Sequence, residues 1–142
     1  MAHVNPSDEQ LEQLLTTATT IAVVGASSNP DKASYGMMRK LQSAGYRVIP
    51  VNPGETAVLG ERAYPSLIDV PEGIDIVDVF RRPGDTPGIA DQAVAAHAKA
   101  LWLQSGIANE EAAARAKAGG LMVVMDACIG STHALLGIPK KR

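Results

Sequence analysis

The residues best suited to chemistry in this chain lie close together, in the segment IAVVGASSNPDKASYG at residues 21–36. Gly25 permits a tight turn, the hydroxyl groups of Ser27 and Ser34 can donate hydrogen bonds, and Lys32 adds a mobile positive charge. Unpaired N–H groups and the positive end of a helix dipole converge where an apolar strand turns into a helix. The segment therefore predicts a local site for a phosphate-bearing ligand.

Residues that could catalyse a reaction are scattered by comparison. The histidines and the single cysteine form no pair at metal-ligand spacing; they are His3, His97, His133 and Cys128. Two carboxylates, Asp75 and Asp78, fall within one predicted strand and have no evident partner. We therefore predict no catalytic residue and no metal site, and we expect a binding protein rather than an enzyme.

Composition limits the classes of partner. A chain of 142 residues fits one domain over residues 1–142, and a net charge of −2 excludes a broadly basic surface for nucleic acid. One cysteine cannot form an internal disulfide, and neither a leader nor a long apolar run is evident. We expect a cytoplasmic protein with no membrane partner. Residues 139–142, which include Lys140, Lys141 and Arg142, are expected to form a solvated basic tail.

Hydrophobic spacing predicts alternating strands and helices. Ser7 and Gln10 have the spacing of a capping box, so a first helix is expected within residues 1–19, packed on the rest of the domain. Apolar runs predict strands at residues 21–25, 46–51, 74–80, 101–103 and 121–125, with a weak strand near 62–64. Helices are expected at residues 34–44, 87–100 and 109–118, with a short turn of helix near 66–69. The pattern predicts an α/β fold: one three-layer, doubly wound, Rossmann-like domain with a mostly parallel sheet.

This topology predicts where a ligand would lie. If the strand at residues 21–25 is central, the chain reverses direction across the sheet between that strand and the one at 74–80. Ligands of open α/β sheets bind at this switch point, outside the carboxyl ends of the strands. Loops 25–32 and 80–84 are therefore expected to form two walls of one cleft.

The dinucleotide-binding fingerprint is incomplete at this turn. Gly25 is followed by Ala-Ser-Ser-Asn-Pro, where G-x-G-x-x-G would place two further glycines. Asn52 and Pro53 stand where an acidic residue would bind the ribose of NAD, although Glu55 follows three residues later. NAD is disfavoured, but an NAD(P)-binding protein stays open as an alternative.

Six segments in a fixed order resemble one known family. They are VVGASSNPDKASYG, VIPVNPG, AYPSL, DIVDVFRRP, LWLQSGI and DACI, and together they span nearly the whole chain. They resemble the small Rossmann-type CoA-binding proteins, which are similar to the CoA-binding domain of the succinyl-CoA synthetase α subunit. One departure is Ala127, where many relatives carry a basic residue before the cysteine.

The resemblance implies that coenzyme A, free or acylated, lies across the switch-point cleft. Its phosphates would lie at the first loop and its remainder along the strand at 74–80. The residues expected to contact it are Gly25, Ala26, Ser27, Ser28, Lys32, Ser34, Tyr35, Gly36, Asn52, Pro53, Val79, Phe80, Arg81, Gln104, Ser105 and Gly106.

Two questions stay open after this resemblance. The chain could be a subunit of a CoA ligase that needs a partner chain, and the sequence leaves the identity of any protein partner unknown. Cys128 could form a mixed disulfide with the thiol of CoA, or be an inert buried cysteine. The phosphohistidine of succinyl-CoA synthetase lies in a separate domain, so its role does not carry over to His133.

Overall fold

A five-stranded parallel sheet forms the centre of the computed structural model, which describes residues 2–141. The strands are β1 (Thr20–Val24), β2 (Arg47–Val51), β5 (Ile76–Val79), β6 (Ala100–Leu103) and β7 (Met122–Val124). Their order across the sheet is β2-β1-β5-β6-β7, and every neighbouring pair is parallel. The predicted α/β fold with a doubly wound, mostly parallel sheet is confirmed.

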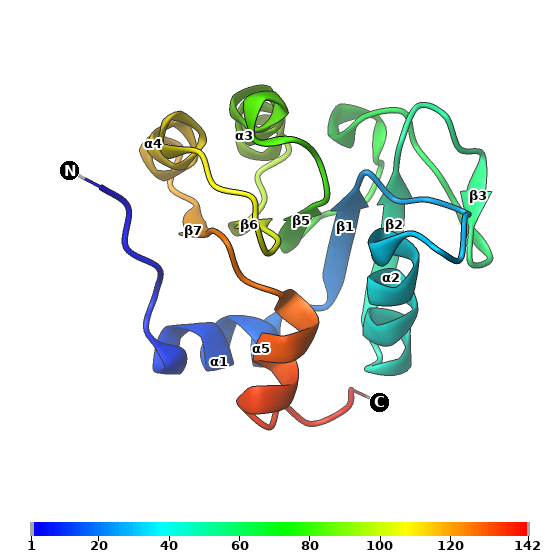
Figure 1. The fold of residues 1–142 in the computed structure, drawn as a ribbon, viewed down its shortest axis with the longest axis horizontal. Helices are drawn as coiled ribbons and strands as arrows, with labels where there is room; N and C mark the ends of the chain where they lie inside the picture. Colours follow the sequence, from blue (N-terminus) through cyan, green and yellow to red (C-terminus); the bar gives the residue numbers. More distant parts are fainter. Residues whose placement is uncertain (1, 142) are drawn as a thin grey trace.

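Helices cover both faces of this sheet (Figure 1). Helices α1 (Asp8–Thr17), α2 (Ala33–Ser43) and α5 (Ile129–Leu135) pack on one face, and α3 (Thr86–Ala95) and α4 (Glu110–Ala118) pack on the other. Strand β6 shows how the two layers are filled: Leu101 and Leu103 join the α3–α4 side, whereas Ala100 and Trp102 join the opposite side. Strands covered on both faces are apolar throughout, which is why they lack an alternating pattern.

Helix caps follow the sequence signals. The Ser7 side chain accepts from the Gln10 amide, and the Gln10 side chain accepts in return from the Ser7 amide, so α1 begins with the predicted capping box. Asn109 caps α4 by accepting from the Ala112 amide at 2.9 Å. These short-range signals fix where the two helices begin.

The predicted end of the third helix is wrong. Residues 87–100 were expected to be helical, but α3 ends at Ala95 and Ala100 is already the first residue of β6. His97 lies between them with a φ of +57°, in the left-handed region that ends a helix. Because this position usually holds glycine or asparagine, the alanine-rich sequence gives no warning of it.

The segment after β2 is mostly irregular. A weak strand was predicted near 62–64. The structure has instead two short strands, β3 (Ala57–Val58) and β4 (Glu61–Arg62), which form an antiparallel hairpin. Tyr64 makes only an isolated parallel bridge to Val51, followed by a 3₁₀ turn at Leu67–Asp69. Strand β2 lies at the edge of the main sheet, where the missing N–H of Pro50 is tolerated.

The carboxyl-terminal residues are not a free tail. The Lys141 amide donates to the Ala44 carbonyl at 2.8 Å, and its ammonium Nζ donates to the Thr16 carbonyl at 2.5 Å. The solvated tail expected at 139–142 is therefore wrong for Lys141, while Lys140 is exposed and Arg142 lies outside the described residues. Within residues 2–141 no helix is both long and apolar enough to span a membrane.

Candidate functional site

The carboxyl ends of three neighbouring strands form the candidate site. Strands β1 and β5 are adjacent, with Val24 opposite Val79, and β2 flanks β1 on its other side. Hydrogen bonds extend this pairing beyond the strands, from the Gly25 amide to the Val51 carbonyl at 2.9 Å and from the Phe80 amide to the Val24 carbonyl at 2.8 Å. The predicted juxtaposition of the loops after β1 and β5 is present.

Gly25 allows the two loops to approach closely. Its φ is +88°, and a Cβ atom added to it would lie 2.3 Å from the Phe80 carbonyl oxygen and 3.1 Å from Arg81 Cδ. No side chain fits at that distance from a backbone oxygen. Glycine is required here for its conformation and also for the space it leaves.

The loop after Gly25 is held by its own polar groups. Ser27 Oγ accepts from the Asn29 amide at 3.0 Å, and Asn29 Oδ1 accepts from the Asp31 amide at 2.9 Å. Asn52, at the end of β2, donates from Nδ2 to the Ala26 carbonyl at 2.8 Å. The side chain expected to shape the ligand pocket thus also fixes the loop that lines it.

The Glu55 carboxylate accepts hydrogen bonds from Ser28, one of the residues predicted to bind a ligand phosphate. Its Oε2 accepts from the Ser28 amide at 2.8 Å and from Ser28 Oγ at 3.1 Å. A carboxylate from the chain therefore lies where the sequence predicted a ligand phosphate at Ser28. The sequence suggested Glu55 only as a ribose ligand. Its contact with the loop depends on the irregular turn after β2.

A first recess, the loop recess, opens above this turn, with a volume of about 380 Å³. Its lining residues are Gly25, Ser27, Lys32, Ala33, Ser34, Asn52 and Phe80. Lys32 is the residue before α2, and its side chain makes no capping hydrogen bond. The amides of Ala33 and Ser34 begin the helix and have no acceptor within residues 2–141. These groups present positive charge and N–H donors to the recess.

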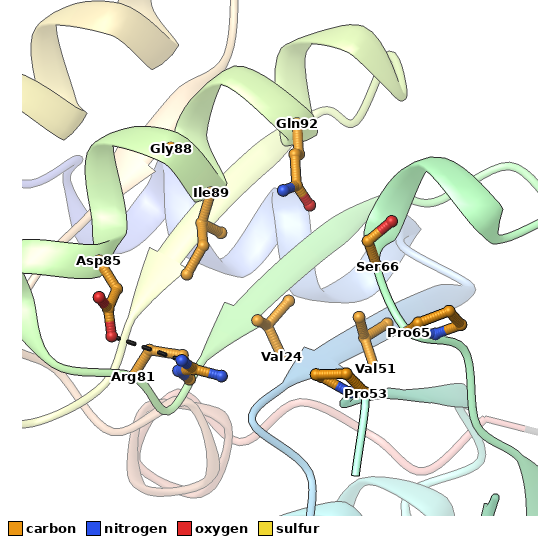
Figure 2. A pocket seen from close by; sticks show the side chains of 10 residues that line it. All are labelled: Val24, Val51, Pro53, Pro65, Ser66, Arg81, Asp85, Gly88, Ile89 and Gln92. Carbon is orange, nitrogen blue, oxygen red and sulfur yellow. Dashed lines mark ion pairs between the residues drawn. The ribbon is translucent and has the colours of Figure 1, made fainter. Parts of the chain in front are cut away.

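A second recess, the α3 recess, lies on the other side of the same strand ends, with a volume of about 270 Å³. Figure 2 shows Ile89 and Gln92 of α3 on one side, Pro65 and Ser66 on the other, and Val24 between them. Arg81 forms part of its wall and pairs with Asp85 at 3.5 Å between Nη2 and Oδ2. The complete lining is Val24, Val51, Pro53, Pro65, Ser66, Arg81, Asp85, Gly88, Ile89 and Gln92.

The two recesses share the same strand ends. At the end of each of the three strands, two consecutive residues line different recesses. The α3 recess is lined by Val24, Pro53 and Arg81. Their neighbours in the chain line the loop recess; they are Gly25, Asn52 and Phe80. One elongated ligand that crosses the sheet edge between them would contact both. Of the predicted ligand residues, eight line a recess: Gly25, Ser27, Lys32, Ser34, Asn52, Pro53, Phe80 and Arg81.

The other predicted residues have different roles. Val79 has no exposed surface and belongs to the core beneath α3, so its expected ligand contact is not available. Gln104 is also buried, and its Oε1 accepts from the Ile129 amide at 3.0 Å, so this side chain supports the start of α5; its contact with a ligand stays a prediction. The remaining residues line neither recess: Ala26, Ser28, Tyr35, Gly36, Ser105 and Gly106.

Sequence reasoning missed the wall of the α3 recess. Pro65, Ser66, Ile89 and Gln92 come from an irregular segment and a helix whose sequences carry no binding motif. Only Asp85 has a signal, since it lies four residues after Arg81 at the spacing of an ion pair. Within the part of the chain that the structure describes, no three acidic, histidine or cysteine side chains group together to hold a metal ion.

A family model described as "CoA binding domain" matches residues 19–134. The chain belongs to this CoA binding domain family. The uncharacterized protein YneT of Bacillus subtilis (strain 168) is 42% identical over 131 residues, which are 92% of this chain and 97% of that protein. A hypothetical protein from Pyrococcus horikoshii OT3 has a TM-score of 0.90 at 37% identity, covering 96% of this chain and 99% of that one.

Relatives of this CoA binding domain also occur within larger proteins. The dinucleotide-forming acetyl-coenzyme A synthetase 1 of Ca. Korarchaeum cryptofilum has a TM-score of 0.72 at 30% identity. The match covers 80% of this chain but only 27% of the synthetase. The sequence-based resemblance to Rossmann-type CoA-binding proteins is confirmed, and the CoA binding domain described here is related to a part of a CoA-linked synthetase.

Proposed function

We propose that this CoA binding domain binds coenzyme A or an acyl-CoA, with the phosphates in the loop recess and other parts of the ligand extending into the α3 recess. The observation that carries the proposal is the division of three strand ends between two recesses. The loop recess offers Lys32, free amides at the start of α2 and two serine hydroxyl groups, which suit phosphate. The α3 recess offers apolar and amide side chains, which suit a less charged group.

Isothermal titration calorimetry with CoA tests this arrangement. Lys32→Ala and Ser27→Ala should each weaken binding by about 1–2 kcal/mol, or roughly 5- to 30-fold, if each side chain makes a charge-assisted contact with phosphate. Ser27 already accepts from the Asn29 amide, but its hydroxyl hydrogen is free to donate to a ligand. Arg39→Ala is the matched control, because Arg39 is an exposed cation on the same helix outside both recesses. Unchanged affinity in both test variants, or equal loss in the control, contradicts the proposed site.

Glu55 distinguishes CoA from the NAD(P) alternative. Its carboxylate occupies the Ser28 amide and hydroxyl, so a phosphate that needs these donors must displace it. Glu55→Gln should therefore strengthen CoA binding by several-fold, since it removes a competing negative charge. If Glu55 instead held the ribose of NAD, the same variant would weaken NAD binding. A thermal-shift panel of CoA, dephospho-CoA, acetyl-CoA, NAD, NADP and ATP on both proteins separates the two outcomes.

A second candidate is a subunit of a CoA ligase, favoured by the similarity to one part of the Ca. Korarchaeum synthetase. In that case the isolated chain binds CoA but forms no acyl-CoA from a carboxylic acid and a nucleotide. Acyl-CoA formation by the isolated chain would contradict the need for a partner chain. The cytoplasmic location stays a prediction.

A further inference from the structure

Cys128 is held in place by two side chains of the sheet. The Trp102 indole Nε1 donates to the Ala127 carbonyl at 2.8 Å, and Gln104 Oε1 accepts from the Ile129 amide at 3.0 Å. These bonds fix the backbone on both sides of Cys128, whose own side chain is half-buried. The thiol is therefore attached at a defined place over the α5 side of the sheet, and it is partly accessible.

Asp78 lies under the same place and has no partner. It stands opposite Trp102 in the register of β5 and β6, and on one strand it alternates with Val77 and Val79, which face α3. Its side chain has no exposed surface, and neither carboxyl oxygen has a hydrogen-bond partner within residues 2–141. Burial raises the pKa of Asp78 well above the ordinary value, and the negative charge of a Cys128 thiolate raises it further.

An unpaired buried carboxyl group is costly, by about 1–3 kcal/mol for a neutral polar group, and is retained where it serves a function. Burial favours the protonated form of this carboxyl group, and neither of its oxygens has a hydrogen-bond partner in the described residues. The negative charge of a Cys128 thiolate acts on the Asp78 carboxyl group, so the two groups are electrostatically coupled.

The Cys128 thiol has the character of a nucleophile. Burial raises its pKa, but hydrogen bonds from Ser131, Gln104 and the Gly130 amide outweigh that effect and lower the pKa below its usual range. The Ser131 amide lies 3.4 Å from Cys128 Sγ. Since the thiolate is the form that attacks a disulfide, these donors increase the reactive fraction at neutral pH.

We propose that Cys128, over the unpaired carboxyl group of Asp78, is a thiol–disulfide exchange site for a small aliphatic disulfide. The Cys128 thiolate attacks one sulfur of the disulfide, the S–S bond breaks as the new bond to Sγ forms, and the second sulfur leaves as a thiolate that takes a proton from water. Cys128 is oxidised to a mixed disulfide, and the departing thiol is the reduced product.

The choice of disulfide rests on the proposed function. Ala26, in the loop after β1, and Ile129, next to Cys128, belong to the same buried cluster, and α5 packs against α2, which begins at the loop recess. A CoA molecule with its phosphates in that recess and its adenosine part in the α3 recess would extend its thiol arm on the α5 side of the sheet edge. CoA disulfide should therefore react faster than glutathione disulfide, by about tenfold for a bound reagent at low concentration.

Intact-mass spectrometry of the full chain tests the exchange site. We expect one adduct with CoA disulfide and one, formed more slowly, with glutathione disulfide; dithiothreitol should remove both, and Cys128→Ser should form neither. The absence of any adduct in the folded protein overturns the inference, even if calorimetry detects CoA binding. Adducts at equal rates without CoA binding leave the exchange site standing and overturn the proposed function instead.

Infrared spectroscopy tests the part played by Asp78. A carboxyl group that is protonated at neutral pH has a C=O band separate from those of ionised carboxylates, and Asp78→Asn should remove that band. Capping Cys128 as a disulfide removes the neighbouring negative charge and should shift the band or its titration. If the variant does not fold, the capped and uncapped wild-type proteins still give the comparison. A band that capping leaves unchanged excludes Asp78 from the site.

Discussion

Replacement of Gly25 by alanine tests the closure between β1 and β5, which forms the candidate site. The φ of +88° costs an alanine about 1–2 kcal/mol. The added Cβ would also lie 2.3 Å from the Phe80 carbonyl oxygen. The Phe80 carbonyl must move away to relieve this contact, and we expect that shift to break the adjacent hydrogen bond from the Phe80 amide to the Val24 carbonyl, now 2.8 Å long. Loss of that bond adds about 1–2 kcal/mol, for a total of about 2–4 kcal/mol.

Two other glycines separate these costs. Gly60 has a φ of +80° but nothing within 4 Å of an added Cβ, so Gly60→Ala carries only the conformational cost of about 1–2 kcal/mol. Gly36 lies inside α2 with nothing within 4 Å and without a positive φ. Gly36→Ala should therefore stabilise the protein by about 0.5–1 kcal/mol.

Urea unfolding monitored by circular dichroism measures these differences, and thermal unfolding provides a check. With about 2.1 cal/mol/K of unfolding entropy per residue, a chain of 142 residues loses roughly 3 °C in Tm for each kcal/mol. Gly25→Ala should lower the Tm by roughly 6–12 °C, Gly60→Ala by roughly 3–6 °C, and Gly36→Ala should raise it slightly. Equal losses for Gly25→Ala and Gly60→Ala would refute the close approach of the two strand ends. CoA affinity should fall in Gly25→Ala but not in Gly60→Ala.

Three further substitutions test contacts that support the fold and the loop. Asp75→Asn should lower the free energy of unfolding by about 1–3 kcal/mol at neutral pH. Partial burial raises the pKa of Asp75, but hydrogen bonds from the backbone and hydroxyl groups at residues 19–20 outweigh this effect and lower the pKa. The difference between variant and wild type should therefore shrink as acid protonates the wild-type carboxylate, and a pH-independent difference in urea titrations contradicts the assignment. Asn52→Ala removes the bond to the Ala26 carbonyl and should cost about 1–2 kcal/mol and weaken CoA binding in calorimetry; full affinity would mean that the loop is held elsewhere. Tyr46→Phe leaves the Leu15 carbonyl without its 2.5 Å partner and should cost about 1–2 kcal/mol, while ultraviolet titration of the wild-type protein should find one tyrosine whose pKa burial has raised to about 12.

Short-range signals made the fold predictable. The capping box at Ser7 and the apolar run at β1 are properties of neighbouring residues, which the sequence displays directly. Alternation of strands and helices then restricts the topology, because parallel crossovers are right-handed and short. The switch point between β1 and β5 follows from that topology, and half of the predicted ligand residues line the recesses there.

The α3 recess could not be predicted in the same way. Its wall joins Gln92 of α3 to Ser66, which lies in an irregular segment. Their proximity depends on how that segment packs, since the 3₁₀ turn beside Ser66 contacts α3 and the Leu67 amide lies 3.4 Å from Gln92 Oε1. No periodicity or turn motif encodes a contact of this kind. For the same reason, the contact between Glu55 and Ser28 had no signal in the sequence.

Asp75 and Asp78 illustrate why residue type alone does not assign a role. Three positions apart within the predicted strand at 74–80, they gave the same signal in the sequence, an acidic residue without a partner. At the amino end of β5, Asp75 accepts from two backbone amides and pairs with Lys99 at 3.3 Å, so its charge stabilises the start of the strand. Further along, Asp78 is fully enclosed, and burial raises the pKa of its carboxyl group well above the ordinary value. Since strand ends have free amides and strand centres have none to spare, position along β5 decides which carboxylate is structural. The one left unpaired is the one beside Cys128, and its cost to the fold is the strongest reason to look for chemistry there.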